Sequence, residues 1–363
     1  MAETNATILI PDISGFTEFM TNSELSHSSH AVKILIDTIV NTIEEEYEIS
    51  VIEGDAVLLV KKGQAPSRKE ILDTCLKIFT AFHCKRKWMI QRIICPCGAC
   101  QTVGNLTLKF IVHYGRVAEI KMGRFITYSG TEMIVAHRLL KNSIGNNEYV
   151  LITEKFVQQM PDVSNAADVE WHHLFDEYGS IGKVDYHFAL LNEAKKKIPD
   201  PPAPDNNYRT DDTPYLEMAI AADFRDVYMA IMNIPGRTEW MPGLQKVEQD
   251  APEVLVGTVH SCIFENYNSF ISPLRMTLSD EGILYAEKCF IETMNLSLVY
   301  EFLFKNVNPE TCTFAARFMN AGESAIPEKI NLVFQEDLRK MAGRLKEHCE
   351  KMEESLFLQF RST

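Results

Sequence analysis

The sequence predicts an α+β protein of two domains, on three observations. Up to about residue 194, strand-like and helix-like segments alternate around a central hairpin. Residues 195–213 are rich in Pro, Asp, Asn and Lys, and their prolines disfavour a helix and indicate an extended linker. Several strand-like runs then lead into one long helical stretch at about 328–358. We therefore expect a first domain at 1–194, a linker at 195–213 and a second domain at 214–363.

The composition limits the partners. A chain of 363 residues is long for one hydrophobic core, and 46% hydrophobic with 24% charged residues is typical of a globular protein. A net charge of −14 argues against nucleic acid or an anionic membrane as the main partner. No apolar run is long enough to span a bilayer, the start does not resemble a secretory signal, and nine cysteines suit a reducing compartment. The prediction is a cytoplasmic protein.

The first domain is expected to contain helices and strands in mixed order. These are a strand at 7–13, a helix from 29, strands flanking residues 54–55, a helix at 68–84, a hairpin turning near Tyr114-Gly115, a helix at 131–143, a strand at 149–153 and a hairpin at 171–191. A hairpin in the middle of this order excludes a simple doubly wound sheet.

Two acidic turns are the first candidate site. Asp12 ends the apolar run "ILIPD", and Asp55 follows Gly54 in "VIEGDAVLLV". If the two strands are neighbours, the carboxylates converge, and paired carboxylates commonly hold Mg²⁺ or Mn²⁺ over a phosphate. The backbone N–H groups that would face this phosphate are those of Ser14, Gly15, Phe16 and Thr17. The alternative is that Asp12 caps a helix and that Gly54-Asp55 is only a hairpin turn.

Four segments resemble class III nucleotidyl cyclases. "ILIPDISGFT" and "VIEGDAVLLV" resemble the two metal motifs, and "LKFIVHYGRVAEIKMGRFITYSGTEMIVAHRLL" and "YVLITEKF" are similar to the stretches that follow, in unbroken order from residue 7 to about 191. The resemblance implies a ferredoxin-like cyclase-homology fold, a nucleoside triphosphate substrate, and a homodimer that shares its active sites. It also implies that Asp12 and Asp55 bind the metal and that Arg138 stabilises charge on the transferring phosphate.

The sequence departs from the cyclase pattern at three positions. Ile134 stands where the family has its transition-state asparagine. Val51 stands in place of the base-reading lysine, and Thr131 stands in place of the other base-reading residue. Glu53 or Glu132 could replace the missing groups. Three interpretations follow: a metal- and nucleotide-binding regulatory protein with degenerate or weak activity, an active cyclase acting on ATP or GTP, or a dimerising scaffold without catalysis.

A cysteine cluster is the second candidate site. Cys95, Cys97 and Cys100 are spaced C-x-C-x₂-C inside an apparent insertion at 84–104. Four thiolates can hold a structural Zn²⁺, and Cys84 is the main candidate for the fourth, with His83 and Cys75 as alternatives. The competing interpretation is buried or redox-active thiols.

The second domain resembles START-type helix-grip domains, the polyketide-cyclase and lipid-transport superfamily. The resemblance rests on "YLEMAIAADFRDVYMAIMNIPGRTEWMPGLQKVE", "VLVGTVHSCIF" and the long last helix. It implies a curved antiparallel sheet around that helix, with a cavity for a hydrophobic small molecule. Six phenylalanines could line the cavity or simply fill the core: Phe264, Phe270, Phe290, Phe302, Phe314 and Phe318. The expected inner face of the helix carries Leu332, Leu338, Met341, Leu345, Cys349 and Met352.

Overall fold

The fold is described from a computed structural model. It describes residues 2–21, 25–94, 102–123, 125–160, 169–204, 207–208, 210, 213–249, 255–322 and 326–361. The chain divides into two compact units. One comprises Met1–Ile90 with Cys97–Pro202, and the other comprises Gln91–Pro96 with Ala203–Thr363. Both units mix helices and strands, which confirms the predicted α+β class. No described helix is long and apolar enough to cross a membrane.

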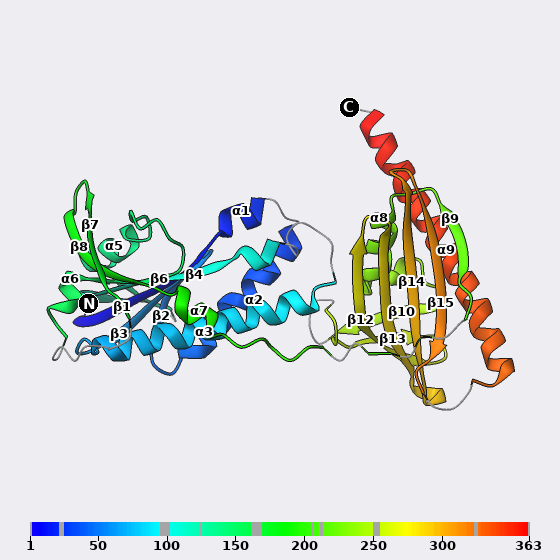
Figure 1. Ribbon diagram of the computed structural model, residues 1–363, viewed down its shortest axis with the longest axis horizontal. Helices are drawn as coiled ribbons and strands as arrows, with labels where there is room; N and C mark the ends of the chain where they lie inside the picture. Colours follow the sequence, from blue (N-terminus) through cyan, green and yellow to red (C-terminus); the bar gives the residue numbers. More distant parts are fainter. Residues whose placement is uncertain are drawn as a thin grey trace. The chain divides into compact units, whose positions relative to one another are not determined.

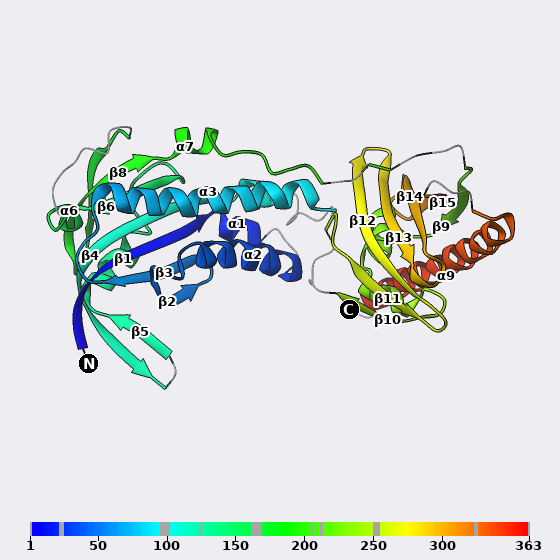
Figure 2. The same ribbon diagram turned by 90° about the horizontal axis from the view of Figure 1, so that it is seen from below.

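The first unit is built on one mixed sheet. In chain order its elements are β1 (Ala2–Ser14), α1 (Phe16–Thr21), α2 (Leu25–Ile43), β2 (Glu48–Glu53), β3 (Ala56–Lys62), α3 (Arg68–Arg92), β4 (Thr107–Met122), β5 (Phe125–Ser129), α5 (Thr131–Arg138), β6 (Tyr149–Thr153), α6 (Glu154–Val157), β7 (His172–Tyr178), β8 (Gly182–Leu190) and α7 (Asn192–Lys196). The strand order is β2-β3-β1-β4-β6-β8-β7, and β5 pairs with β4. Figures 1 and 2 show α2 and α3 on one face of this sheet and α5 on the other.

The turn predicted near Tyr114-Gly115 is wrong. β4 continues through both residues, and its hairpin with β5 turns around Gly123, whose φ is +60°. Gly115 has a packing role instead, because a Cβ there would lie 2.5 Å from the Cγ of Glu132. The glycine therefore allows the start of α5 to approach the strand.

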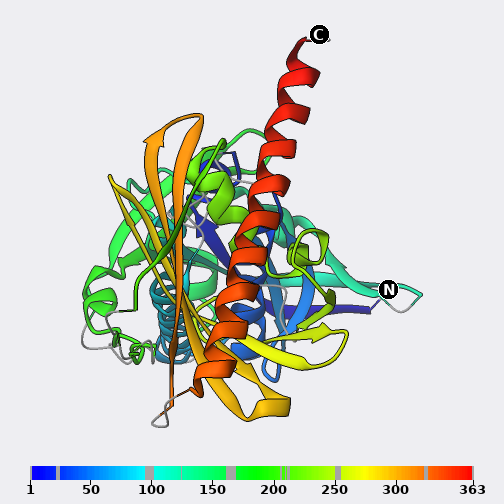
Figure 3. The ribbon, with the colours of Figure 1, turned by 90° about the vertical axis from the view of Figure 1, so that its right-hand side faces the viewer.

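The second unit is a seven-stranded antiparallel sheet with helices on it. Its elements are β9 (Leu216–Ile220), α8 (Phe224–Met232), β10 (Leu244–Gln249), β11 (His260–Phe264), β12 (Asn268–Ser279), β13 (Gly282–Ile291), β14 (Leu296–Asn308), β15 (Thr311–Asn320) and α9 (Glu328–Arg361). The order is β10-β11-β12-β13-β14-β15-β9. Figure 3 shows α9 crossing one face of the strands.

The inner face of α9 differs from the prediction at both ends. Its buried residues are Phe334, Leu338, Met341, Ala342, Leu345 and Cys349. Leu332 and Met352, both predicted to face inward, are more than half exposed. Phe334 takes the inward place because spacings of four, three and four residues keep side chains on one face of a 3.6-residue helix.

A short segment after helix α3 belongs to the second unit. Ile93 forms an antiparallel bridge with Leu255, and the N–H of Val256 donates to the Arg92 carbonyl at 2.9 Å. Ile94 is fully buried, and its carbonyl accepts a hydrogen bond from the Tyr228 hydroxyl. The second unit is thus completed by residues that precede it in the sequence by more than 100 positions.

Candidate functional site

Asp12 and Asp55 are brought together by strand pairing. Asp12 lies in β1, in register with Ala56 of β3 and with Lys109 of β4. Asp55 is the residue before β3, and its carbonyl accepts a hydrogen bond from the N–H of Ile13 at 2.9 Å. The two carboxylates interact electrostatically, and Asp12 is largely buried. The expected convergence at one end of these neighbouring strands therefore has a backbone basis.

Two glycines with left-handed backbone conformation shape this end of the strands. Gly15 and Gly54 have φ of +88° and +61°, which a side chain would strain. A Cβ on Gly54 would lie 3.7 Å from the Phe16 ring, so this ring lies against the turn that carries Asp55. α1 begins at Phe16, within the "SGFT" stretch that follows Asp12.

Lys109 is a member of the site that the sequence reasoning missed. Its Nζ lies 3.0 Å from Oδ2 of Asp12 and donates to the Leu140 carbonyl at 3.2 Å. In the sequence, Lys109 looks like an ordinary polar residue of an amphipathic strand, and only the register with Asp12 reveals its position. Burial and the charge of Asp12 raise the pKa of Asp55, while Lys109 acts in the opposite direction.

The residues fit a divalent cation that is shared with a phosphate ligand. Mg²⁺ is usually held by one or two carboxylates and completes its shell with water and substrate phosphates. Ser14 is two residues from Asp12 on β1, so both side chains point to the same side, and its buried Oγ has no hydrogen-bond partner in the described part of the chain. Within the described residues, no three or more His, Cys, Asp or Glu side chains form a preassembled metal cage.

Arg138 is not placed against the two aspartates within the chain. It is the last residue of α5 and is exposed, and its side chain has no ion pair or hydrogen bond to either aspartate. Ile134, one turn earlier, is 54% exposed. Thr131, at the start of the helix, is also exposed. These three α5 residues are therefore exposed to solvent and do not complete the site in one chain.

The structure removes Glu132 as a base-reading candidate. Its Oε2 is 2.6 Å from His113 Nε2, and its Oε1 accepts from Lys155 at 2.5 Å. His113 also contacts the Thr153 hydroxyl at 2.8 Å through Nδ1. This network joins β4, α5 and β6, so Glu132 and His113 support the fold. Glu53, the other candidate, is exposed and pairs with His137 at 2.8 Å.

We expect the Glu132 network to make the first unit acid-sensitive. The hydrogen bond from His113, with that from Lys155, lowers the pKa of Glu132 to about 2. A lowered carboxyl pKa stabilises the fold above the ordinary value near 4.5, and this stabilisation is lost as the pH falls towards 2. Glu132→Gln should lose about 1–2 kcal/mol at pH 7 and converge with the wild type in acid. Thermal unfolding from pH 7 to 2 checks this, and a difference independent of pH would contradict it.

Most of the cysteine cluster lies outside the described residues, namely Cys95, Cys97 and Cys100. Cys84 is a free, partly exposed thiol on α3. The two alternatives for the fourth ligand are poorly suited. Cys75 is buried, which raises its thiol pKa, and buried His83 lies 3.2 Å from Glu148. Of the three, Cys84 is the accessible one, and the Zn²⁺ site stays a prediction.

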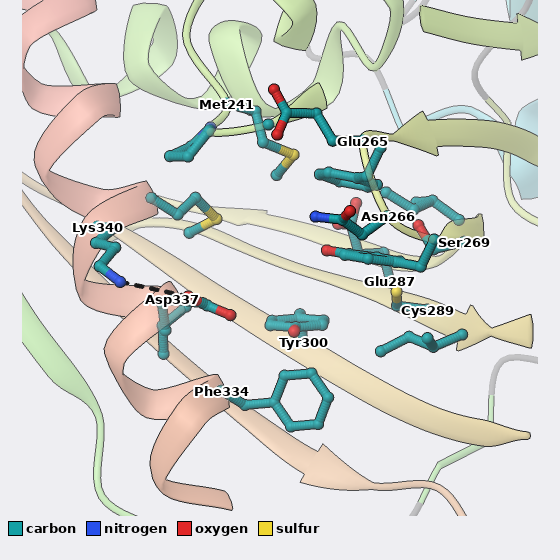
Figure 4. Close-up of a pocket in the computed structure, with 18 of the residues that line it drawn as sticks. Met241, Glu265, Asn266, Ser269, Glu287, Cys289, Tyr300, Phe334, Asp337 and Lys340 are labelled. Carbon is teal, nitrogen blue, oxygen red and sulfur yellow. Dashed lines mark ion pairs between the residues drawn. The ribbon is translucent and has the colours of Figure 1, made fainter. Parts of the chain in front are cut away.

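The second unit contains a cavity of about 370 Å³ (Figure 4). It lies between the inner sheet face and α9, and Phe264 and Phe302 are among its lining residues. The other four predicted phenylalanines do not line it. Phe314 and Phe318 are buried in the core beside it, whereas Phe270 and Phe290 pair with each other. Their neighbours Ser269, Ile271, Cys289 and Ile291 line the cavity, so Phe270 and Phe290 face the opposite side of the sheet.

Comparisons of sequence find relatives of unknown function. A family described as a protein of unknown function (DUF2652) matches residues 32–149. An uncharacterized protein of Mycobacterium tuberculosis, Rv2561/Rv2562, is 28% identical over 161 residues, which is 44% of this chain and 73% of the relative.

Several solved structures that are similar to about half of the chain are cyclase domains. The catalytic core of a rhodopsin-guanylyl cyclase has a TM-score of 0.38 and 16% identity, over 52% of this chain and 97% of that one. A bacterial light-regulated adenylyl cyclase has a TM-score of 0.38 and 16% identity, over 51% of this chain and 52% of that one. The adenylyl cyclase CyaB from P. aeruginosa has a TM-score of 0.37 and 14% identity, over 52% of this chain and 95% of that one.

Proposed function

We propose that the first unit binds Mg²⁺ or Mn²⁺ together with a nucleoside triphosphate at Asp12 and Asp55, with weak or degenerate cyclase activity. In this proposal it is a regulatory domain, and the second unit responds to a hydrophobic small molecule. The observation that carries the proposal is the convergence of two carboxylates on neighbouring strands, beside a buried hydroxyl that has no hydrogen-bond partner among the described residues. The resemblance of residues 7–191 to the cyclase motifs is the reason for proposing a nucleotide as the phosphate ligand.

The charges at the site favour a cation that arrives with its phosphate. The chain has a net charge of −14, so a polyanionic ligand needs a local positive charge. Lys109 already neutralises part of the charge of Asp12. The remaining negative charge is a weak site for a free divalent ion and a better one for an ion whose other ligands are phosphate oxygens. Phe16 and Gly54 would form the wall next to the phosphates.

The same site explains why turnover should be weak. Ile134 offers no hydrogen-bond donor to a ribose, and Val51 offers none to a base. Loss of one polar contact at a transition state typically lowers the rate about 10²–10³-fold. Arg138 and the metal ion would remain. Cyclisation by an active enzyme with its own recognition residues is the alternative.

Exposed apolar side chains support a homodimer. Val51 and Ile52 of β2, Ile126 of β5 and Ile134 of α5 are 36%, 49%, 43% and 54% exposed. β2 and β5 lie close together, because Ser50 and Thr127 approach to 3.4 Å between their hydroxyls. A second copy would cover these side chains and bring its Arg138 towards the aspartates. If the aspartates bind nothing, this surface alone would suit a dimerising scaffold.

In the second unit, we propose a helix-grip domain with a ligand cavity. The support is the open space between the inner sheet face and α9, with apolar and aromatic walls of the kind that bind small molecules. The size suits one drug-sized ligand.

Calorimetry of the purified chain with Mn²⁺ plus ATP or GTP, together with chromatography for cyclic product, tests the first-unit proposal. Binding that requires Mn²⁺ and is lost in Asp12→Asn, with little or no product, is the expected result. Efficient product formation would instead support the active cyclase, and absence of binding would support the scaffold. Asp73→Asn is a matched control, because Asp73 is an exposed α3 residue paired with Lys69.

Lys109→Met should tighten the binding of Mn²⁺ alone. The ammonium group lies 3.0 Å from the Asp12 carboxylate, and its removal leaves both negative charges to the ion. A unit charge at this distance near a protein surface corresponds to about a tenfold change or more in affinity. Titration with Mn²⁺ followed by electron paramagnetic resonance measures the effect. Unchanged affinity would place the ion away from Asp12.

A further inference from the structure

The cavity of the second unit has a polar centre on its inner sheet face. Glu287 of β13 and Tyr300 of β14 stand directly opposite each other in the strand register, and both line the cavity. Figure 4 shows Tyr300 between the α9 residues Phe334 and Asp337 and the strand residues Glu287 and Cys289. Apolar side chains surround this centre, including Ile271, Ile291, Phe302, Leu338 and Met341.

The carboxylate of Glu287 keeps one place for a further hydrogen bond. Arg237 donates to Oε1 at 2.8 Å and to Oε2 at 2.6 Å, and the Tyr285 hydroxyl donates to Oε2 at 2.8 Å. Since each carboxylate oxygen can accept two hydrogen bonds, one position on Oε1 has no donor among the described residues. Glu287 and Arg237 are 2% and 0% exposed, so their charges offset each other inside the protein.

The Tyr300 hydroxyl is a hydrogen-bond donor that lines the cavity and has no acceptor among the described residues. No hydrogen bond to this hydroxyl exists among the described residues. Burial raises the pKa of Tyr300 well above its usual value, so the phenol stays neutral and keeps its proton. A ligand oxygen in the cavity would accept this hydrogen bond.

The other lining residues disfavour a charged ligand. Lys340, the cationic residue among the lining side chains, lies 3.8 Å from Asp337 on the same helix (Figure 4). Glu265 adds a further acidic group at the exposed edge. A carboxylate or phosphate ligand would therefore enter without an unpaired positive charge to meet it.

Flat aromatic walls favour a planar ligand. The rings of Tyr300 and Phe302 are nearly parallel, at 8°, and those of Phe264 and Tyr267 stack at 11° with centroids 4.6 Å apart. A cavity of about 370 Å³ has room for one ring system, not for a lipid with two long acyl chains.

We propose that this cavity binds an uncharged, planar ring compound that carries a hydroxyl group, and that Tyr300 and Glu287 recognise this hydroxyl. The ligand oxygen accepts a hydrogen bond from the Tyr300 hydroxyl, and the ligand O–H donates a hydrogen bond to Oε1 of Glu287. The inference rests on the proposed ligand-binding role of the second unit and adds the chemical class of the ligand. Selectivity then comes from the hydroxyl, because apolar walls alone would favour a methyl group in its place.

Three naphthalene probes test this inference on the full-length chain by fluorescence titration or calorimetry. 2-Naphthol and 2-methylnaphthalene have nearly the same shape and differ in a hydroxyl against a methyl, whereas 2-naphthoate carries a negative charge. We expect 2-naphthol to bind about tenfold or more tightly than 2-methylnaphthalene, since one or two net hydrogen bonds are worth this much. We expect 2-naphthoate to bind more weakly than either.

Tyr300→Phe should reduce the preference for 2-naphthol to about threefold or less and leave the affinity for 2-methylnaphthalene within about twofold. Tyr208→Phe is the matched control, because Tyr208 donates its hydroxyl to Glu301, whose side chain is on the other face of β14. That variant should keep the wild-type preference. Equal or weaker binding of 2-naphthol, or strongest binding of 2-naphthoate, would overturn the inference. Failure of all three probes to bind would instead reject the ligand-binding role itself.

Discussion

Asp55→Asn is expected to abolish Mn²⁺-dependent triphosphate binding and at the same time to raise the melting temperature of the protein. Loss of the direct ligand should weaken binding at least about 100-fold, since even the outer partners of metal ligands typically contribute 10–100-fold. The stability change has the opposite sign because burial and the nearby Asp12 raise the pKa of Asp55. A raised carboxyl pKa means that the ionised form destabilises the folded state at neutral pH.

The rise should be about 1–3 °C at pH 7, and it should shrink as the pH falls towards the ordinary pKa of aspartate, where the wild type is protonated as well. Scanning fluorimetry at pH 7 and pH 4 measures it. Asp12→Asn should also lose binding but lower the melting temperature, because it removes the partner of Lys109. Asp73→Asn should change neither property. Retained triphosphate binding in Asp55→Asn would exclude the two-carboxylate site.

Arg237→Met is expected to destabilise the second unit by about 3–5 kcal/mol. Arg237 and Glu287 form a buried, bidentate pair, and the guanidinium also donates through Nε to the Ile231 carbonyl at 2.7 Å. Removal of the arginine leaves a carboxylate inside the protein, with Tyr285 as its remaining hydrogen-bond donor among the described residues. The unpaired charge, rather than the lost attraction, accounts for most of the cost.

The double variant Arg237→Met/Glu287→Met separates these two causes. Replacement of both partners by apolar side chains is often neutral or stabilising, so the double variant should recover most of the loss. Hydrogen exchange of peptides from β13 and β14 follows the local stability, and peptides from β1 are an internal control. A single variant that loses less than about 1 kcal/mol would show that the Glu287 carboxylate is not isolated from water.

Local patterns in the sequence predict the helices and strands better than they predict the contacts between residues that are distant in the sequence. The turns at Gly15 and Gly54 and the apolar strands before and after them indicate where Asp12 and Asp55 meet. Lys109 escapes this reasoning because nothing local distinguishes it from other strand lysines. The Arg237–Glu287 pair joins residues 50 positions apart, on a short helical turn and a central strand, and has no local signature either.

Glycine and helix periodicity account for the other errors. Gly115 suggests a turn, but its lack of a side chain makes room for Glu132 inside a continuous strand. In α9, Leu332 and Met352 belong to the hydrophobic pattern of the sequence, yet the helix turns them outward and Phe334 inward. In both cases a partner distant in the sequence decides between two local possibilities.

The segment Gln91–Pro96 has a consequence for how the two halves of the gene can be separated. A fragment beginning at Ala203 would lack Ile93, which bridges Leu255, and Ile94, whose carbonyl receives the Tyr228 hydroxyl. A fragment ending at Pro202 would carry the buried Ile94 without the residues that cover it. The spatial boundary between the two units therefore does not correspond to a single position in the sequence. Recombination or truncation at the proline-rich linker would separate Gln91–Pro96 from the rest of the second unit.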